Sequence, residues 1–386
     1  MNNNKRIIGL DVLRSIAILL VMLMHSGSMF LPLAKLPLIG NIVGKLLAII
    51  IPVGYLGVEL FFVLSGYLIG SILIKLFSDN KKPIFKEIKQ FWIRRWLRTL
   101  PNYYFVLLIN YVVFVFILNS YPFNWKYLFF IQNFISVQPS FFRESWSLAV
   151  EEWSYFLLPI IMFVCFVLFK KSSSKFLILL SICLIILLSF CVKFAFLFTN
   201  FHQFIPFDEQ LRKVVLFRLD AIMYGFLMAW LMHYFSSFFL KHKIIFLLLG
   251  LFFLVILVWY FYINGNFELE NQTSNFIIVF INRMFWIPLV GVSFSFMIPF
   301  FATLISFNNN ILNTVFMFIS KISYSLYLIH FPVYALIFFK KLPFLYIQQS
   351  LYNIMSYFTV CFVIAYLLYR FWELPFLKWR DNKFKN

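Results

Sequence analysis

The sequence predicts an all-α integral membrane protein with about ten transmembrane helices and both termini in the cytoplasm. Three observations support this fold class. Only 12% of the 386 residues are charged and 63% are hydrophobic, 56 of them Phe, whereas a soluble protein carries about 25% charged residues. The apolar residues fall into stretches of about 20, the length of a membrane-spanning helix. The basic residues are concentrated on one predicted side, and a soluble cytosolic enzyme is excluded.

Ten apolar stretches are long enough to cross a bilayer, and most of them end in charged or Asn-rich segments. The first is too long for a cleaved signal peptide and contains charged residues. We assign residues 1–375 to one transmembrane domain and residues 376–386 to a basic cytoplasmic tail, and we expect no soluble C-terminal domain. The predicted spans are residues 8–30, 49–74, 101–119, 146–169, 176–198, 216–238, 244–263, 284–306, 312–339 and 351–372.

Lys and Arg residues in the short loops orient these spans. With a cytoplasmic N-terminus, twenty of the 33 basic residues lie on the cytoplasmic side and ten on the opposite side. Residues 75–100, between the second and third spans, contribute eight of the twenty. The net charge of +19 therefore reflects membrane topology, and we expect no binding to nucleic acid. The four cysteines lie in predicted spans without metal-ligand spacing, so we expect neither a metal site nor a disulfide framework.

Charged side chains inside a span cost several kcal/mol unless they are paired or solvated, so they are functional candidates. Arg14 and His25 are separated so that they share nearly one helix face, about 16 Å apart along the axis. Asp11 lies within about 60° of both. This stripe indicates a site; the alternative is a local Asp11–Arg14 pair with His25 linking two helices. At the start of the sixth span, we expect Arg218 and Asp220 to form a local ion pair.

Polar residues also occur in the second and fourth spans. Glu59 lies near the outer end of the second span and Ser65 lies deeper; solvation at the membrane surface and close helix packing are the respective alternatives. Ser147, Glu151 and Tyr155 repeat every four residues and therefore share one face of the fourth span. Such a face suits general acid–base chemistry or a hydroxyl substrate, whereas the alternative is a solvated helix start.

Two further sets complete the candidates. Tyr327 and His330 share one side of the ninth span, where helix packing is the alternative to substrate binding. Before the third span, Arg94 and Arg98 share a helix face with Arg95 beside them. Because arginine forks match phosphate oxygens, this cluster suggests a site for a phosphorylated cytoplasmic donor. Contacts with anionic lipid headgroups are the alternative.

The chain resembles the membrane acyltransferase 3 family over nearly its whole length and in the family's motif order. It departs from the family pattern at Val12, where Gly is frequent, and at Trp153, where Gln is frequent; neither position carries a proposed catalytic group. The matching motifs are LDVLRSIA at 10–17 with His25, GVELFFVLSGYLIG at 57–70, RRWLRTLP at 94–101, WSLAVEEWSYFLLP at 146–159, RLDAIMYG at 218–225, SYSLYLIH at 323–330 and WELP at 372–375.

The resemblance implies an integral membrane O-acyltransferase. Such an enzyme moves an acyl group, most often acetyl, from cytoplasmic acyl-CoA to a hydroxyl of an extracytoplasmic glycan such as lipopolysaccharide O-antigen. His25 would be the base or a transient acyl carrier, and Arg14 would help to hold acetyl-CoA, a donor substrate and not a permanently bound cofactor. The candidate residues are His25, Arg14, Asp11 and Glu151 for catalysis, Arg14, Arg94, Arg95 and Arg98 for the donor, and Glu59, Ser65, Ser147, Tyr155, Tyr327 and His330 for the acceptor.

The resemblance also implies a bacterial cytoplasmic membrane location. The expected partners are acyl-CoA, membrane lipids and a glycan or lipid-linked glycan, and a separate extracytoplasmic protein could replace the esterase-like domain that some family members carry. The alternative function is a transporter or flippase in which Asp11, His25, Glu59 and Glu151 relay protons. Binding or hydrolysis of acetyl-CoA distinguishes the two functions.

Overall fold

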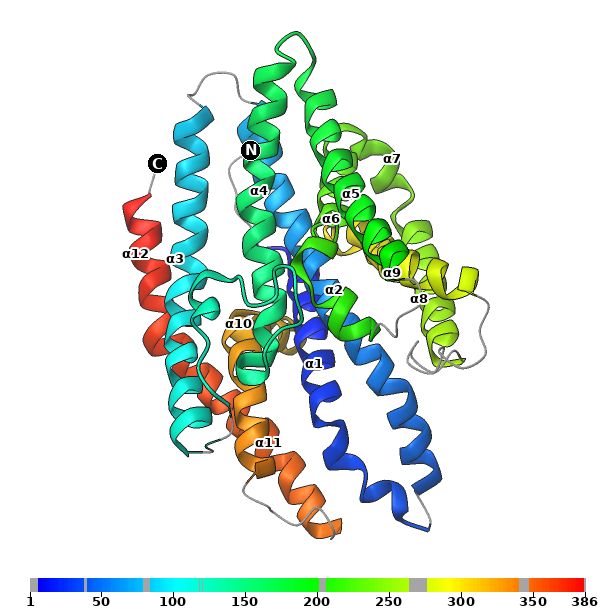
Figure 1. Cartoon of the computed structure of the whole chain (residues 1–386), viewed down its shortest axis with the longest axis vertical. Coiled ribbons are helices and arrows are strands. Elements are labelled where there is room, and N and C mark those ends of the chain that lie inside the picture. The colour runs from blue at the N-terminus through cyan, green and yellow to red at the C-terminus, as the bar shows by residue number, and fades with distance from the viewer. Residues whose placement is uncertain are drawn as a thin grey trace.

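The computed structural model describes residues 6–37, 40–78, 84–117, 119, 121–200, 206–263, 276–339 and 347–384. All regular structure in these ranges is helical, and the long helices run side by side in an elongated bundle (Figure 1). Within the same ranges, nine helices are long and apolar enough to cross a membrane. The prediction of an all-α membrane protein with about ten spans is therefore confirmed. The basic positions predicted at 79–83 and 385–386 lie outside the described residues.

Twelve α-helices are interspersed with short 3-10 and π turns in the described chain. The first group is α1 (Ile8–Phe30), α2 (Gly40–Ser78), α3 (Ile84–Tyr111), η3 (Trp125–Phe129), η4 (Ser140–Ser145), α4 (Trp146–Leu168) and α5 (Ser174–Thr199). The second group is η5 (Phe207–Arg212), η6 (Val215–Phe217), α6 (Met223–Tyr234), α7 (Ser236–Lys241), α8 (Lys243–Ile263), α9 (Phe276–Phe301), α10 (Asn310–Phe339), α11 (Ile347–Leu368), η8 (Tyr369–Glu373) and α12 (Leu374–Lys383).

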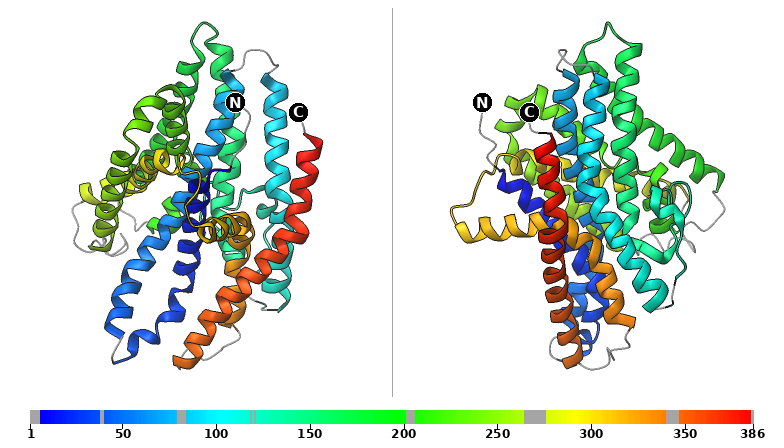
Figure 2. Two further views of the ribbon diagram at one scale, coloured as in Figure 1. Left: turned by 180° about the vertical axis from the view of Figure 1, so that it is seen from behind. Right: turned by 90° about the vertical axis from the view of Figure 1, so that its left-hand side faces the viewer.

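The helix ends gather at two opposite ends of the bundle. The end of α2, the start of α3 and the α4–α5 turn lie at the upper end in Figure 1, and the end of α1, the start of α2 and the end of α3 lie at the lower end. The same end of the bundle therefore carries Lys75, Lys86 and Lys170. The distribution of basic residues had placed these three lysines on one side of the membrane. Which end faces the cytoplasm stays a prediction. Figure 2 shows α11 and α12 as one column, joined through the π turn η8.

The third helix begins much earlier than predicted. Helix α3 starts at Ile84 and continues through Pro101, so the arginine cluster lies on the helix and not in a loop before it. A proline inside a helix removes one backbone donor and crowds the carbonyl four residues earlier, a cost that α3 bears at Pro101. Tertiary contacts hold the added turns in place, because the indole nitrogen of Trp92 donates to the Tyr155 carbonyl of α4 at 3.1 Å.

The sixth predicted span, residues 216–238, is wrong as a single helix. The structure divides it into η6, α6 and α7, and the 12 residues of α6 extend only about 18 Å, short of the roughly 30 Å hydrocarbon core. A turn replaces the first part of the predicted helix. It is fixed by Arg218, a fully buried residue whose guanidinium binds Glu59 of α2.

Helices α2 and α6 cross at two glycines. A Cβ atom on Gly66 would collide with the carbonyl oxygen of Ile222, and one on Gly225 would collide with that of Val63. Only glycine permits this approach, so close packing by small residues, the alternative interpretation in the second span, applies at Gly66. The crossing anchors the side of α2 that faces away from the candidate site.

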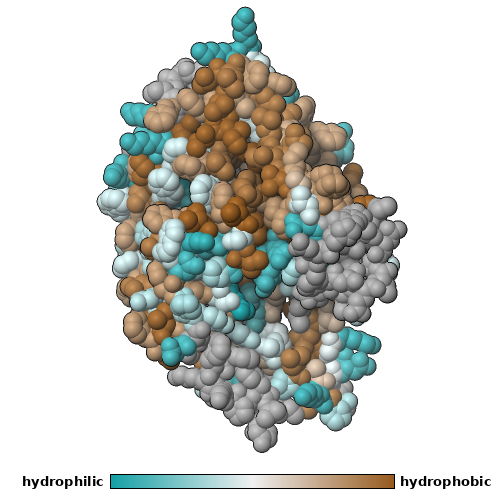
Figure 3. All heavy atoms as spheres, in the orientation of Figure 1, coloured by the Kyte–Doolittle hydropathy of each residue, from teal (hydrophilic) through white to brown (hydrophobic). Residues whose placement is uncertain are grey.

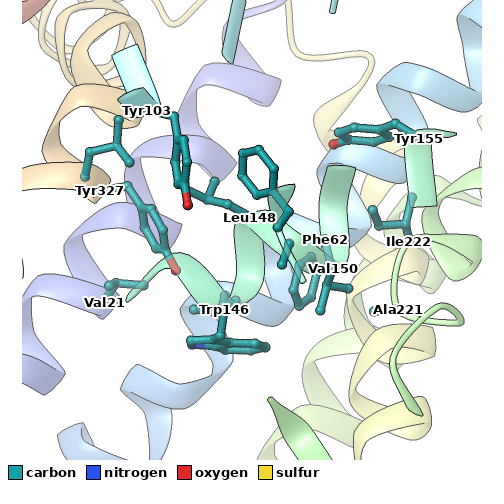
Figure 4. Close-up of a cluster of buried hydrophobic side chains, with 14 of the residues drawn as sticks. Val21, Phe62, Tyr103, Trp146, Leu148, Val150, Tyr155, Ala221, Ile222 and Tyr327 are labelled. Atoms are coloured by element: carbon teal, nitrogen blue, oxygen red, sulfur yellow. The ribbon is translucent and has the colours of Figure 1, made fainter. Parts of the chain in front are cut away.

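Aromatic side chains from α2, α3, α4 and α10 form the core beside this crossing. Figure 4 shows Phe62, Tyr103, Trp146 and Tyr327 converging on one volume, and the rings of Phe62 and Trp146 meet edge to face with centroids 5.9 Å apart. Figure 3 shows apolar atoms over α4 and α5 in the upper half of one face, above a more polar band. Helix α5 also exposes large apolar side chains such as Leu187, as is typical of helices in contact with lipid.

Candidate active site

Asp11 in the first turn of α1 is fixed by two neighbours. Nε and Nη2 of Arg6 donate to its two carboxylate oxygens at 2.5 and 2.8 Å, and Ser320 Oγ of α10 donates at 2.6 Å. The hydrogen bond to Asp11 raises the pKa of Arg6. The ion-pair partner of Asp11 is thus Arg6 and not Arg14. With both oxygens occupied, Asp11 fixes the start of α1 against α10.

Arg14 and Arg98 stand where two cavities meet. The first, which we call the basic cavity, has a volume of about 490 Å³. The second, the central cavity, has a volume of about 410 Å³. Arg14, Leu68 and Arg98 line both. The remaining lining of the basic cavity is Arg6, Ile7, Leu10, Asp11, Ser320, Lys321, Tyr369, Glu373, Leu377 and Arg380.

The two arginines are free to bind a ligand. Arg14 makes one long hydrogen bond, 3.4 Å from Nη1 to Ser320 Oγ. Among the residues that the structure describes, Arg98 makes no ion pair and no side-chain hydrogen bond. An unpaired guanidinium at the edge of a cavity favours an anionic ligand, because it supplies donors in a fixed fork.

The central cavity combines apolar walls with one polar edge. Ser65 Oγ of α2 donates to Glu151 Oε1 of α4 at 2.8 Å, and Glu151 Oε2 lies 3.9 Å from Nη2 of Arg95. The structure therefore brings three predicted residues from three helices together. The remaining lining is Val58, Phe61, Phe62, Ile69, Ser71, Ile72, Thr99, Ser147, Leu148, Ser323, Tyr324 and Tyr327.

Two predicted residues lie near this cavity without lining it. Tyr155 is buried behind it, where its hydroxyl accepts a hydrogen bond from Nη2 of Arg95 at 2.8 Å and its ring lies 4.2 Å from the Arg95 Cζ. Tyr155 thus orients Arg95. Arg94, one residue earlier on α3, is exposed and lines neither cavity. The predicted role of Arg94 in donor binding stays a prediction.

His25 lies in a third cavity near the opposite end of α1. This histidine cavity has a volume of about 400 Å³. Ser28 Oγ and the Tyr334 hydroxyl are 2.8 Å apart in its wall. Because α1 is one continuous helix, Arg14 and His25 hold the axial separation that the sequence predicted. The cavity is lined by Met24, His25, Ser28, Phe114, Tyr121, Arg143, Phe331, Tyr334 and Ala335.

Tyr327 and His330 of α10 lie between the central cavity and His25. The ring centroid of His330 is 5.0 Å from that of His25 and 5.6 Å from that of Tyr327. The Nδ1 atom of His330 lies 2.6 Å from the Tyr327 carbonyl, which only accepts, so Nδ1 carries the hydrogen. Nε2 of His330 is buried and has no hydrogen-bond partner among the residues that the structure describes. The two imidazoles and the phenol form a continuous row.

The hydroxyl of Tyr327 is fixed from α4. It donates to the Glu144 carbonyl at 2.9 Å and lies 2.5 Å from Ser147 Oγ. These bonds join the start of α4 to α10 at the inner end of the row. Ser147 and Tyr327, both predicted, therefore meet in the structure, although 180 residues separate them.

Glu59 belongs to a separate buried charge cluster. Its two oxygens bind Arg218 at 3.2 and 2.5 Å, and Arg212 Nε lies 3.2 Å from Oε1. The carboxylate lines none of the three cavities, so the structure does not bring Glu59 to the other candidates. The expected Arg218–Asp220 pair is wrong, because Arg218 turns to Glu59. Asp220 instead accepts from the Tyr224 hydroxyl at 2.9 Å.

Asp208 of η5 completes this cluster outside the spans. Arg212 Nη1 donates to Asp208 Oδ1 at 2.8 Å, and Lys213 forms a second ion pair with the same carboxylate. Burial alone would raise the pKa of Asp208, but the two cations outweigh burial and lower the pKa. The cluster thus ties the 206–218 segment to α2.

Several cavity residues escaped the sequence reasoning. Lys321 and Arg380 line the basic cavity, yet in the sequence they are ordinary basic residues of a cytoplasmic side. Arg143 and Phe331 line the histidine cavity and lie outside the quoted motifs. Of these four residues, Arg143 alone carried a sequence signal, because it lies just before the motif of the fourth span.

The chain's similarity to known proteins agrees with this arrangement. Residues 7–370 match the model of a family described as an acyltransferase domain. The chain belongs to the acyltransferase 3 family. It is therefore a multi-pass membrane protein of a family with bacterial members. No solved structure matches it.

Three bacterial relatives give the range of similarity. A protein of Staphylococcus aureus (strain MRSA252), provisionally named an O-acetyltransferase, is 29% identical over 404 residues, 97% of this chain and 59% of that protein. Peptidoglycan O-acetyltransferase OatA of Listeria monocytogenes is 35% identical over 127 residues, 29% of this chain and 20% of that one. YrhL of Bacillus subtilis, provisionally named a peptidoglycan O-acetyltransferase, is 31% identical over 137 residues, 31% of this chain and 21% of that protein. The family member described here thus spans about three fifths of the Staphylococcus relative.

Proposed function

We propose that this family member is a membrane O-acetyltransferase. It takes an acetyl group from cytoplasmic acetyl-CoA and transfers it to a hydroxyl of a glycan on the opposite face of the bacterial cytoplasmic membrane. One observation carries the proposal: Arg14 and Arg98, two guanidiniums without a carboxylate partner in the described structure, lie where a basic cavity opens into a cavity with apolar walls. A phosphorylated head with a long neutral arm is the ligand that suits this arrangement.

The two cavities match the two halves of acetyl-CoA. The basic cavity offers Arg14, Arg98, Lys321 and Arg380 to phosphate oxygens, against Glu373 as an opposing carboxylate. The central cavity offers a largely apolar slot to the pantetheine arm. In this pose the thioester points along α1 toward Tyr327 and away from the exposed Arg94.

The reaction needs a base near the acceptor. A base removes the proton of the glycan hydroxyl, the oxygen attacks the thioester carbonyl, and the carbon–sulfur bond breaks to give a CoA thiolate, which takes up a proton. His25 is the proposed base, in ring contact with His330. Because Tyr327 and His330 lie between His25 and the central cavity, the proposal requires these two rings to move when both substrates bind.

The acceptor is proposed to be a glycan of the cell envelope. Peptidoglycan is a candidate because OatA, which is similar to part of the chain, is named for it. Lipopolysaccharide O-antigen is a second candidate that the family resemblance suggests. The further protein partner suggested for the extracytoplasmic side belongs to the same proposal.

The test compares wild type with His25→Ala in two measurements. The first is acetyl-CoA binding by the purified protein, and the second is mass spectrometry of surface glycans from expressing cells, which detects an acetyl increment lost on mild alkali. We expect His25→Ala to bind acetyl-CoA normally and to leave the glycan without acetyl groups. Normal acetylation by a correctly inserted His25→Ala variant would refute the mechanism. If wild type neither binds nor hydrolyses acetyl-CoA, the transporter with a proton relay through Asp11, His25, Glu59 and Glu151 is the better function.

A further inference from the structure

We infer that the histidine cavity binds a glycan that carries a negative charge, and that Arg143 recognises this charge. The ligand class is a sugar with a carboxylate or a phosphate within one or two residues of the acetylated hydroxyl. This inference rests on the proposed function, because it names the acceptor of that reaction. It assigns to Arg143 a part in specificity that the family motifs do not contain.

Arg143 faces His25 across one phenyl ring. The Cζ atom of Arg143 is 6.0 Å from the ring centroid of Phe331, and this centroid is 5.6 Å from that of His25. The guanidinium and the imidazole line the same cavity. A sugar whose hydroxyl meets the imidazole therefore brings the groups on its own ring, or on the next one, to the guanidinium.

The charge of Arg143 is not neutralised by the protein. The side chain is exposed, and it forms no ion pair with any acidic residue in the described parts of the chain. The carboxylate of the adjacent Glu144 is buried, with 4% of the residue exposed, and it interacts with Arg143 through the electrostatic field without forming an ion pair. Among the described residues that line the histidine cavity, none is acidic and Arg143 carries the formal charge.

The backbone that carries Arg143 is held rigidly. The neighbours Phe141 and Phe142 are buried, and the Tyr127 hydroxyl donates to the Pro139 carbonyl at 2.6 Å. Burial raises the pKa of Tyr127 to about 12, so this hydroxyl keeps its proton. Gln138 Nε2 donates to the Arg143 carbonyl at 3.1 Å. These contacts fix the backbone from which the Arg143 side chain extends, so binding a ligand orders the side chain and not the turn.

The rest of the wall suits a sugar. Phe114, Phe331, Tyr121 and Tyr334 offer ring faces to the apolar side of a pyranose, and Ser28 adds a hydroxyl for hydrogen bonding. A cavity of about 400 Å³ has room for one or two sugar rings. A wall of aromatic rings with one unpaired cation distinguishes an acidic glycan from a neutral one by charge.

The experiment measures glycan binding without acetyl-CoA, using the full chain in nanodiscs of zwitterionic lipid. Two matched pairs of probes separate the two anionic groups. One pair is a tetrasaccharide of alternating N-acetylglucosamine and N-acetylmuramic acid and the same sugar with its carboxylates converted to carboxamides. The other is maltotetraose 6-phosphate and maltotetraose. The variants are Arg143→Gln, Arg143→Lys and the control Lys126→Gln, which removes a nearby positive charge that lines none of the three cavities.

We expect wild type to bind at least one charged probe ten- to a hundredfold more tightly than its neutral partner, the effect of one or two charge-assisted hydrogen bonds. Arg143→Gln should abolish the preference, Arg143→Lys should retain part of it, and Lys126→Gln should retain all of it. The proposal is overturned if no charged probe binds better than its partner, or if Arg143→Gln keeps the preference. An effect of Arg143→Gln on binding to anionic lipid alone would assign Arg143 to the membrane surface and would also overturn it.

Adding acetyl-CoA separates this inference from the proposed function. If wild type acetylates a neutral probe as fast as its charged partner, the function stands and the inference fails. If wild type prefers the charged probe but forms no acetyl ester with it or with isolated cell-envelope glycan, the inference stands and the function fails. His25→Ala should keep the binding preference of wild type and lose acetyl transfer.

Discussion

Arg98 and Arg94 offer a decisive comparison for donor binding. Both belong to the arginine cluster that the sequence assigns to acetyl-CoA, and they are one helical turn apart on α3. Arg98 lines both the basic and the central cavity, whereas Arg94 is exposed and lines neither. The sequence assigns both residues to the donor without ranking them, and the structure predicts unequal effects.

The perturbation is replacement of each arginine by glutamine, which removes the charge and keeps most of the side-chain length. A hydrogen bond to a charged group contributes about 1.5–3 kcal/mol, and each 1.4 kcal/mol is tenfold in affinity. Arg98 has no competing partner among the described residues, so its donors are available to a phosphate. We therefore expect Arg98→Gln to raise the Kd for acetyl-CoA about ten- to a hundredfold. Arg94→Gln should change the Kd less than about twofold, as expected for an exposed charge.

Isothermal titration calorimetry of the solubilised variants measures these dissociation constants. Size-exclusion profiles matching wild type control for misfolding. Dephospho-CoA, which lacks the 3′-phosphate and keeps the diphosphate, tests as a second ligand whether Arg98 contacts the 3′-phosphate. A Kd for Arg98→Gln equal to that of wild type would refute the assignment of the two cavities to the donor. An equally large loss for Arg94→Gln would show that affinity depends on the surface charge of α3.

Three further predictions concern stability and use thermal unfolding of the solubilised protein. Glu59→Gln leaves Arg218 buried without a carboxylate and should lower the free energy of unfolding by about 3–5 kcal/mol. Gly225→Ala places a methyl group against the backbone of α2 and should lower the free energy of unfolding by about 1–3 kcal/mol. Gly44→Ala has open space around its Cβ position, so no steric clash should lower the free energy of unfolding. Folding lowers the pKa of Asp208, so its carboxylate stabilises the protein above about pH 4 and this contribution disappears at lower pH. Asp208→Asn should therefore be less stable than wild type at pH 7, and the difference should shrink below about pH 4.

Each of these predictions has an outcome that contradicts it. Unchanged stability of Glu59→Gln would mean that water reaches Arg218. Equal effects of Gly225→Ala and Gly44→Ala would argue against the close crossing of α2 and α6. A stability difference for Asp208→Asn that stays constant from pH 7 to pH 3 would show that the carboxylate does not act through its charge.

Local pattern was sufficient for much of the fold. Spans such as 8–30 and 176–198 could be predicted closely, because length and hydrophobicity decide whether a segment leaves water for lipid. The 216–238 segment failed for a tertiary reason. Its apolar composition fits a span, but the buried Arg218 is paired with a residue on another helix, and this contact replaces the first turns by a bend.

The candidate site shows the same division. The spacing of Arg14 and His25 on one helix fixed their face and separation, because a helix has a constant rise and twist. The sequence also placed Ser147 and Glu151 on one face, and the structure joins that face to α2 and α10. Charge pairing was less predictable, since the partner of Asp11 is Arg6 and not Arg14.

By itself the sequence determined the membrane class, the helical content, the family motifs and the depth of Arg14 and His25 along α1. Each of these depends on composition or on the geometry of a single helix. Only the tertiary structure decided that Arg98 and not Arg94 borders the cavities, that Glu59 is occupied by arginines, and that Arg143 shares a cavity with His25. These facts depend on how helices turn toward one another, and that choice is made by side chains far apart in the chain.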